Sequence, residues 1–334
     1  MRTLIFRLFL AFCLLVPATR SAKGWRTDGN KWPSGRLVMN LRLGAPSGTL
    51  TDGSASWDVV AQNAMAIWNR NITNVQFYYN TTVSTINNSD GNNTIYWSSN
   101  VFGSSFGSST LAVTSRVFSG GRTTEADITF NNTKSWNSYR GRLTTASGGG
   151  YLNDFRRVAL HELGHVLGLQ HPDDFGQSVQ AQMNSTEGDL DGLTSDDIAG
   201  AQYLYGAPPT DEQKYHALAV QYQSYFYSIG DSANAGYYYY YFEGLSVQAG
   251  YQARGLDTVG LGYYYIYYAN ALNAYYTGYG YYASAYYSLY TYDAIGFYYV
   301  YLGYGDSASA SSYYTYYTNL AASYYRSLTA SGYH

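Results

Sequence analysis

The chain of 334 residues carries 19 lysines and arginines against 22 aspartates and glutamates, a formal net charge of -3 at pH 7. This slightly acidic balance argues against nucleic acid or an anionic membrane surface as a partner. The length is sufficient for two domains.

Residues 1–22 have the pattern of a secretory signal peptide. Arg2 and Arg7 precede an apolar run at residues 8–16, and small residues follow. The run is too short to span a bilayer, and no later stretch qualifies as a transmembrane segment. We therefore expect a secreted, extracellular protein. Its mature chain would lack Cys13, the only cysteine, and hence any disulfide.

Residues 23–206 show the periodicities of an α+β domain with a mixed sheet. Apolar residues at helical spacing predict a helix over 57–68 with Ser56 as its N-cap, and a second helix beginning near Asn153 or Asp154. Strands are predicted at residues 36–43, 93–97, 111–118 and 126–130.

The second helix contains the most informative stretch of the chain, His161-Glu-Leu-Gly-His-Val-Leu-Gly-Leu-Gln-His171. His161 and His165 are four residues apart, so both imidazoles lie on one helix face and can reach one ion. Gly168 can end the helix in the left-handed conformation, which lets His171 approach the same ion from another direction. Three protein ligands leave a fourth position open, as in catalytic zinc sites, and Glu162 stands beside it.

This HExxHxxGxxH pattern resembles that of the metzincin zinc metalloproteases, and three further stretches resemble the matrixin branch. Met183 stands where the family has its Met-turn, Glu125-Ala126-Asp127-Ile128 resembles a matrixin strand, and residues 193–206 resemble the closing helix. Thr194 and Asp197 have the form of a capping box, and we assign no catalytic role to Asp196 or Asp197. The resemblance implies a zinc endopeptidase acting on protein or peptide substrates.

The chain also departs from the family. No histidine precedes His161, so we expect the second, structural zinc of animal matrixins to be absent, and the cysteine-switch propeptide is missing. The Pro-x-Tyr usual after the Met-turn is replaced by Asn184-Ser-Thr-Glu187, so cleavage preference cannot be carried over. A structural calcium ion bound by Asp127 is an open alternative, although we interpret Asp127 as a solvated carboxylate at a strand end.

The composition changes after residue 206. Residues 207–211, with Pro208 and Pro209, are interpreted as a linker, and residues 212–334 as a second domain that holds 35 of the 42 tyrosines. Tyr264-Tyr-Ile-Tyr-Tyr-Ala-Asn270 matches Tyr313-Tyr-Thr-Tyr-Tyr-Thr-Asn319, which indicates an internal repeat.

Aspartates that resemble helix N-caps recur in this region at spacings of about one and two units of 25 residues, at Asp231, Asp257 and Asp306. We predict an all-α repeat of about five antiparallel helices that start near residues 212, 231, 257, 281 and 306. The alternative is a tyrosine-rich β or amyloid-like adhesive segment.

The sequence as a whole predicts a secreted endopeptidase. His161, His165 and His171 would bind Zn²⁺, Glu162 would be the general base, and Met183 would underlie the metal. His216 and His334 are interpreted as ordinary residues. The tyrosine-rich region is a candidate for binding a surface or polymer. The competing hypotheses are a non-enzymatic surface or adhesive protein with an idle metal site, and a hydrolase acting on another bond.

Overall fold

The computed structural model describes residues 24–82, 86–145, 149 and 151–333, so the predicted signal peptide lies outside the described residues. The chain divides into two compact units, Met1–Pro208 and Pro209–His334. None of the described helices is long and apolar enough to cross a membrane.

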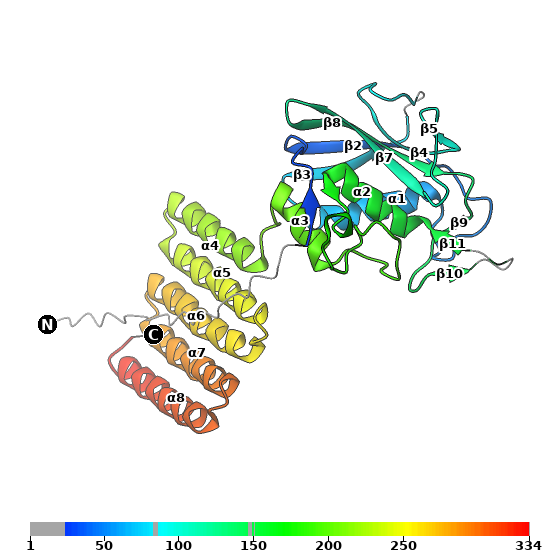
Figure 1. The fold of residues 1–334 in the computed structure, drawn as a ribbon. Coiled ribbons are helices and arrows are strands. Elements are labelled where there is room, and N and C mark those ends of the chain that lie inside the picture. The colour runs from blue at the N-terminus through cyan, green and yellow to red at the C-terminus, as the bar shows by residue number, and fades with distance from the viewer. Residues whose placement is uncertain (1–23, 83–85, 146–148, 150, 334) are drawn as a thin grey trace. The chain divides into compact units, whose positions relative to one another are not determined.

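The first unit is built on a five-stranded mixed sheet with the order β3-β2-β4-β8-β7 (Figure 1). Neighbouring strands are parallel except β7, which pairs antiparallel with β8 and forms one edge. The strands are β2 (Gly35–Arg42), β3 (Val75–Asn80), β4 (Asn93–Ser98), β7 (Ala112–Ser119) and β8 (Arg122–Asn131).

Two helices, α1 (Trp57–Asn69) and α2 (Phe155–Leu167), contact each other and pack on this sheet. Aromatic side chains fill the shared core: Phe155 of α2 lies 4.4 Å from Phe130 of β8 and 5.2 Å from Trp57 of α1, between ring centroids. Trp68 of α1 is fully buried, and its indole N–H donates to the carbonyl of Leu160 at 3.0 Å. α2 is therefore anchored from two sides.

Short elements connect and flank this core. They are β1 (Arg26–Thr27), β5 (Asn100–Val101), β6 (Ser104–Ser105), β9 (Trp136–Asn137), β10 (Thr144–Thr145), β11 (Tyr151–Asp154), β12 (Leu169–Gln170), the 3-10 helix η1 (Asp173–Phe175) and α3 (Ser195–Tyr205). β1 pairs antiparallel with β12, which directly follows α2.

The predicted α+β fold with a mixed sheet is confirmed. Ser56 caps α1 by accepting from the Val59 N–H at 3.2 Å, and Thr194 and Asp197 form the capping box of α3. The strand β3 was not predicted from the sequence. Its residues Val-Gln-Phe-Tyr-Tyr-Asn alternate between apolar and polar only over the first three positions.

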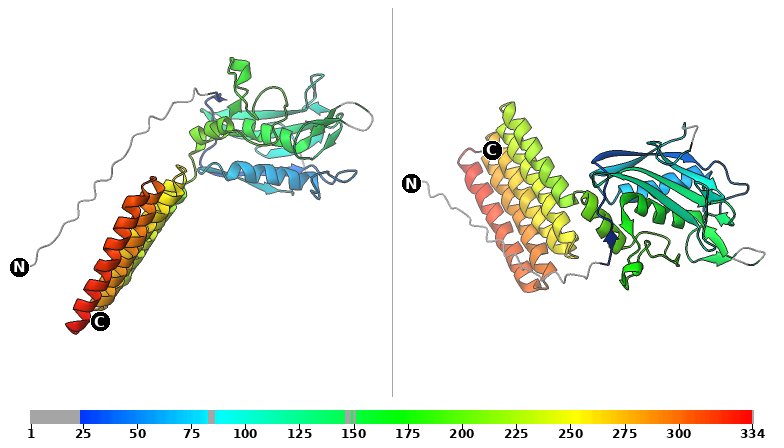
Figure 2. Two further views of the ribbon diagram at one scale, coloured as in Figure 1. Left: turned by 90° about the horizontal axis from the view of Figure 1, so that it is seen from below. Right: turned by 45° about the horizontal axis from the view of Figure 1, so that its top comes forward.

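The second unit is helical, as predicted. It contains α4 (Asp211–Ser228), α5 (Ser232–Gln252), α6 (Asp257–Gly278), α7 (Tyr282–Gly303) and α8 (Ser307–Ala330). Each helix packs on the next, and Figure 2 shows them side by side in one layer. The pairs are antiparallel, because the start of one helix contacts the end of the next, as at Ala233 and Gly278.

A left-handed glycine ends each of the first four helices at strict 25-residue intervals: Gly230, Gly255, Gly280 and Gly305, with φ between 71° and 84°. The residue after each glycine donates its N–H back to the last helical turn, as Tyr281 does to the Tyr276 carbonyl at 2.8 Å. Asp231 and Asp306 act as N-caps, accepting from Asn234 and Ser309. The third expected cap, Asp257, is instead the first helical residue, and Leu256 occupies the N-cap position without a side-chain bond.

Candidate metal centre

The three candidate histidines are delivered by α2 and by the turn after it. His161 and His165 lie one turn apart on α2, and Gly168 ends the helix with φ 104°. A Cβ on Gly168 would approach the carbonyl oxygen of Asn30 at 2.8 Å, so both the conformation and the space favour glycine there. The chain then pairs with β1 and returns to place His171 against the helix.

The Nε2 atoms of the three histidines converge. Nε2 of His171 lies 3.1 Å from Nε2 of His161 and 2.9 Å from Nε2 of His165. Each Nδ1 faces an acceptor on the other side of its ring: the Gln182 carbonyl for His161, the Leu169 carbonyl for His165, and the Asp174 carboxylate for His171, at 2.8–2.9 Å.

These partners determine the tautomers. A carbonyl oxygen only accepts, so Nδ1 of His161 and of His165 must carry the proton, and Nε2 must present its lone pair. Burial lowers the pKa of His161 to about 4 and lowers the pKa of His165 well below its usual value, which keeps both rings neutral. Converging lone pairs from neutral imidazoles are the donor set that suits Zn²⁺, whose tetrahedral geometry sets N···N distances of about 3.3 Å.

Glu162 lies on α2 next to His161 and is almost fully buried. Burial raises the pKa of its carboxyl to about 7, while the hydroxyl of Thr114 opposes that shift by donating to Oε2 at 2.5 Å. Thr114 lies on the edge strand β7, which places this edge of the sheet alongside the candidate metal centre. A carboxyl group with a pKa near neutrality is suited to proton transfer.

Met183 is buried and packs against Gly164 of α2. A Cβ on Gly164 would overlap its sulfur, so glycine at this position of α2 lets the methionine pack against the helix. The turn around Met183 is held by Asp197 of α3, which accepts from the N–H groups of Gln182 and Met183 at 2.9 and 3.1 Å. Because the Gln182 carbonyl accepts from His161, Asp197 supports a candidate metal ligand through one intervening turn.

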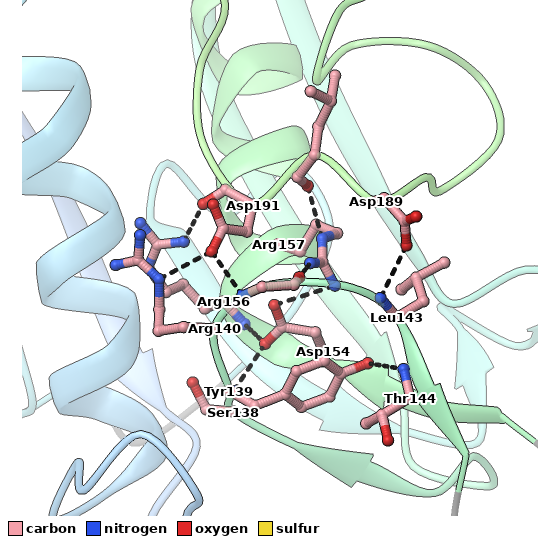
Figure 3. A network of polar contacts seen from close by, with 12 residues as sticks. Ser138, Tyr139, Arg140, Leu143, Thr144, Asp154, Arg156, Arg157, Asp189 and Asp191 are labelled. Atoms are coloured by element: carbon pink, nitrogen blue, oxygen red, sulfur yellow. Dashed lines mark hydrogen bonds and ion pairs between the residues drawn. The ribbon is translucent and has the colours of Figure 1, made fainter.

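The loop after Met183 is tied to the start of α2 by a network of arginines and carboxylates (Figure 3). Arg157, fully buried, donates to the carbonyl of Leu190 at 2.6 Å and lies 3.4 Å from Asp154. Arg140 pairs with Asp191 and Arg142 with Asp189, both at 3.0 Å. Apart from the local pair of Asp154 and Arg157, the sequence signalled none of these contacts, because their members lie 33 to 51 residues apart.

The interpretation of Asp127 as a solvated strand-end carboxylate was wrong. β8 continues to Asn131, and Asp127 is only 1% exposed, accepting from the Thr94 N–H at 2.9 Å. Burial, together with the charges of Glu125 and Asp90, raises the pKa of Asp127 to about 7.

Of the predicted site residues, the three histidines lie together, Glu162 adjoins them in the chain and Met183 packs against the same helix. Sequence reasoning missed Thr114, Asp174, Gln182 and the role of Asp197 in the turn. Asp174 could have been found, since it follows His171 by three residues. Thr114 could not, since it is 48 residues from Glu162.

Comparison with known protein families agrees with this geometry. The family model described as Matrixin matches residues 48–206. The metalloendoproteinase 2-MMP of Arabidopsis thaliana is 43% identical over 56 residues, which cover 17% of this chain and 15% of that protein. Macrophage metalloelastase of Oryctolagus cuniculus is 49% identical over 55 residues, 15% of this chain and 11% of that protein. Stromelysin-3 of Xenopus laevis is 34% identical over 84 residues, 25% of this chain and 15% of that protein.

These matches span at most 15% of the length of these three relatives. The matched family region ends at Gly206, so the helices α4–α8 lie outside it.

Proposed function

Because residues 48–206 form a matrixin-like domain, we propose that the protein is a zinc-dependent endopeptidase that hydrolyses peptide bonds in protein substrates. The observation that carries this proposal is the convergence of three Nε2 atoms whose Nδ1 partners are all hydrogen-bond acceptors. Matrixins are zinc metalloendopeptidases in general, and the similarity to them supports the proposed activity. Bound zinc would supply Lewis acidity toward water and toward the scissile carbonyl.

The side chains take separate roles in this proposal. His161, His165 and His171 hold the ion as neutral imidazoles. Glu162 is the general base, which accepts a proton from the attacking water at its carboxylate and later delivers it to the leaving amine. Thr114 holds that carboxylate in place, and Met183 supports the floor of the site.

A casein or gelatin digestion assay tests the proposal. The mature chain should digest either protein, a chelator should abolish the activity, and added Zn²⁺ should restore it. Glu162→Gln should keep its zinc, measured by metal analysis, and lose at least about a thousandfold in rate. A fully active Glu162→Gln variant would exclude Glu162 as the base, and an inactive wild type with bound zinc would favour an idle site.

We also propose that the protein is secreted, on the basis of the pattern at residues 1–22. N-terminal sequencing of material from the culture medium checks this, with a first residue near Lys23 as the expected result.

For α4–α8 we propose attachment to a surface or polymer, motivated by exposed tyrosines such as Tyr225, Tyr316 and Tyr304. The competing hypothesis is a non-enzymatic adhesive protein whose function is adhesion through these helices. Equal retention of the full chain and of residues 23–206 on insoluble polymers and cell envelopes would remove the support for attachment.

A further inference from the structure

The helical repeat builds the same aromatic pair at three of its four interfaces. Residues 226, 251 and 301, which differ by multiples of 25, stack on residues 238, 263 and 313 of the following helix. The pairs are Phe226 with Tyr238, Tyr251 with Tyr263, and Tyr301 with Tyr313, with ring centroids 4.8–5.0 Å apart and planes within 11°. At three interfaces the repeat therefore places an aromatic ring at the position that corresponds to residues 238, 263 and 313.

The interface between α6 and α7 departs from this arrangement. Its equivalent residues are Tyr276 and Ser288, so the first ring is present and the second is replaced by a hydroxymethyl group. Among the described residues, Tyr276 has only Tyr275, its chain neighbour, as a ring contact, edge-on at 5.6 Å. At this interface Tyr276 therefore lacks the stacked ring that the following helix supplies at the other three interfaces.

A cavity of about 560 Å³ lies at this place, within the size range of sites for small molecules. Its lining includes Tyr276 of α6, Ser284, Tyr287 and Ser288 of α7, and Tyr325 and Arg326 of α8. Tyr287 and Tyr325 form a tilted ring pair with centroids 5.3 Å apart. The cavity therefore combines aromatic walls with two serine hydroxyl groups and a guanidinium. These side chains come from α6, α7 and α8, the helices labelled in Figure 1.

The charge of the cavity restricts the chemical class of ligand that it can bind. Arg326 and Arg254 are the only lysines or arginines after Lys214. Arg254 lies over the ring of Tyr251, 4.4 Å from its centroid, which leaves Arg326 as the cation of the cavity. Among the described residues, no acidic side chain lines it. A guanidinium beside neutral aromatic walls is complementary to a carboxylate, which it can bind in bidentate fashion.

We propose that this cavity binds an aromatic ring that bears a carboxylate. The ligand ring stacks on Tyr276 in the place that Tyr238, Tyr263 and Tyr313 fill elsewhere, and its carboxylate pairs with Arg326. Such a group occurs both at the end of a peptide with a C-terminal aromatic residue and in small phenolic acids. The proposal is independent of the proposed peptidase activity, since it rests on α6–α8 alone.

Binding to the full chain is measured by NMR titration with N-acetyl-L-tyrosine and with 4-hydroxybenzoate, which separate the peptide and phenolic sources. For probes of this size a Kd of about 0.1–1 mM is expected. N-acetyl-L-tyrosinamide, which lacks only the charge, should bind about tenfold more weakly. Absence of saturable binding by both acids would overturn the proposal.

Two variants locate the site. Ser288→Tyr restores the ring of the repeat, so it should raise or keep the midpoint of thermal unfolding while weakening binding at least tenfold. Ser312→Tyr, an exposed position on α8 outside the cavity, is the matched control and should bind as the wild type does. Arg326→Gln should remove the preference for the acid over the amide without changing the midpoint. Wild-type binding by Ser288→Tyr, or an unchanged preference in Arg326→Gln, would contradict the assignment.

Discussion

At the scale of single residues, the candidate centre depends on which nitrogen of each imidazole is already engaged. Carbonyl groups of Gln182 and Leu169 and the carboxylate of Asp174 take the three Nδ1 positions. Three lone pairs then face one point, where they repel each other unless a cation lies between them. The motif spacing predicts that His161 and His165 share a face, whereas the Nδ1 partners decide the tautomers; those partners are local for His165 and His171 and distant in the chain for His161.

Thr114 offers a test of how the carboxylate of Glu162 is held. On the proposed function, Thr114→Val removes the hydroxyl that donates to Oε2, so kcat should fall on the order of tenfold while KM and zinc content stay the same. Thr114→Ser retains a hydroxyl and should recover most of the rate. Steady-state kinetics on a soluble peptide measures both. A loss confined to KM, or equal losses in both variants, would contradict a positioning role.

Asp127 predicts a dependence of stability on pH. The pKa of Asp127 is raised to about 7 in the folded protein, above its usual 3.8, mainly by burial. Ionisation therefore costs the folded state increasingly as pH rises from about 4 to 7, and the full cost applies above pH 7. Asp127→Asn should be more stable than the wild type at pH 8, by about 2–4 kcal/mol at most, and the difference should vanish near pH 4.

Urea unfolding of both proteins at several pH values, in the presence of a chelator, measures this difference. If the difference in unfolding free energy between the wild type and Asp127→Asn did not change with pH, Asp127 would not titrate between pH 4 and pH 8. Calcium binding at Asp127 would reverse the order when Ca²⁺ replaces the chelator.

At the scale of helices, glycine serves two different purposes in α4–α8. Gly230, Gly255, Gly280 and Gly305 adopt positive φ and end helices. Gly296, within α7, instead lets two helices approach, since a Cβ there would lie 2.5 Å from the Ile266 side chain and 2.8 Å from the Gly262 carbonyl oxygen. The stop glycines can be predicted from the 25-residue spacing, whereas the contact glycines cannot, because their neighbours belong to another helix.

A pair of alanine substitutions separates these purposes. Gly280→Ala introduces only backbone strain, since nothing lies within 4 Å of its Cβ, and should cost about 1 kcal/mol. Gly296→Ala must push α6 and α7 apart and should cost about 2–3 kcal/mol or more. Urea unfolding followed by far-ultraviolet circular dichroism compares them. A smaller cost at Gly296 than at Gly280 would mean that the two helices are not closely packed there.

At the scale of the whole molecule, the chain consists of two units stabilised by different means. The first has a core of large apolar and aromatic side chains, and the second packs small residues between helices and displays tyrosines. All six tryptophans lie between residues 25 and 136, so their fluorescence reports the first unit alone. Of the eight α-helices in the described part of the chain, five belong to the second unit.

The two units should therefore unfold separately. On the proposed function, a chelator should lower the midpoint of the transition followed by tryptophan fluorescence, because zinc bound to the three histidines would stabilise only the folded first unit. The main helical transition, followed by circular dichroism in the same sample, should not move. A common shift of both transitions would show that the two units unfold as one.

The sequence by itself determined the features that depend on local spacing. These are the shared face of His161 and His165, the end of α2 at Gly168, the helix starts after residue 207 and the family to which the first unit is similar. Helix periodicity, capping and the left-handed conformation of glycine act within a few residues, so they can be read without a fold. Only the tertiary structure brought Thr114 to Glu162, Asp197 to the Met183 turn and Tyr276 to Ser288, because packing joins residues that the chain keeps apart.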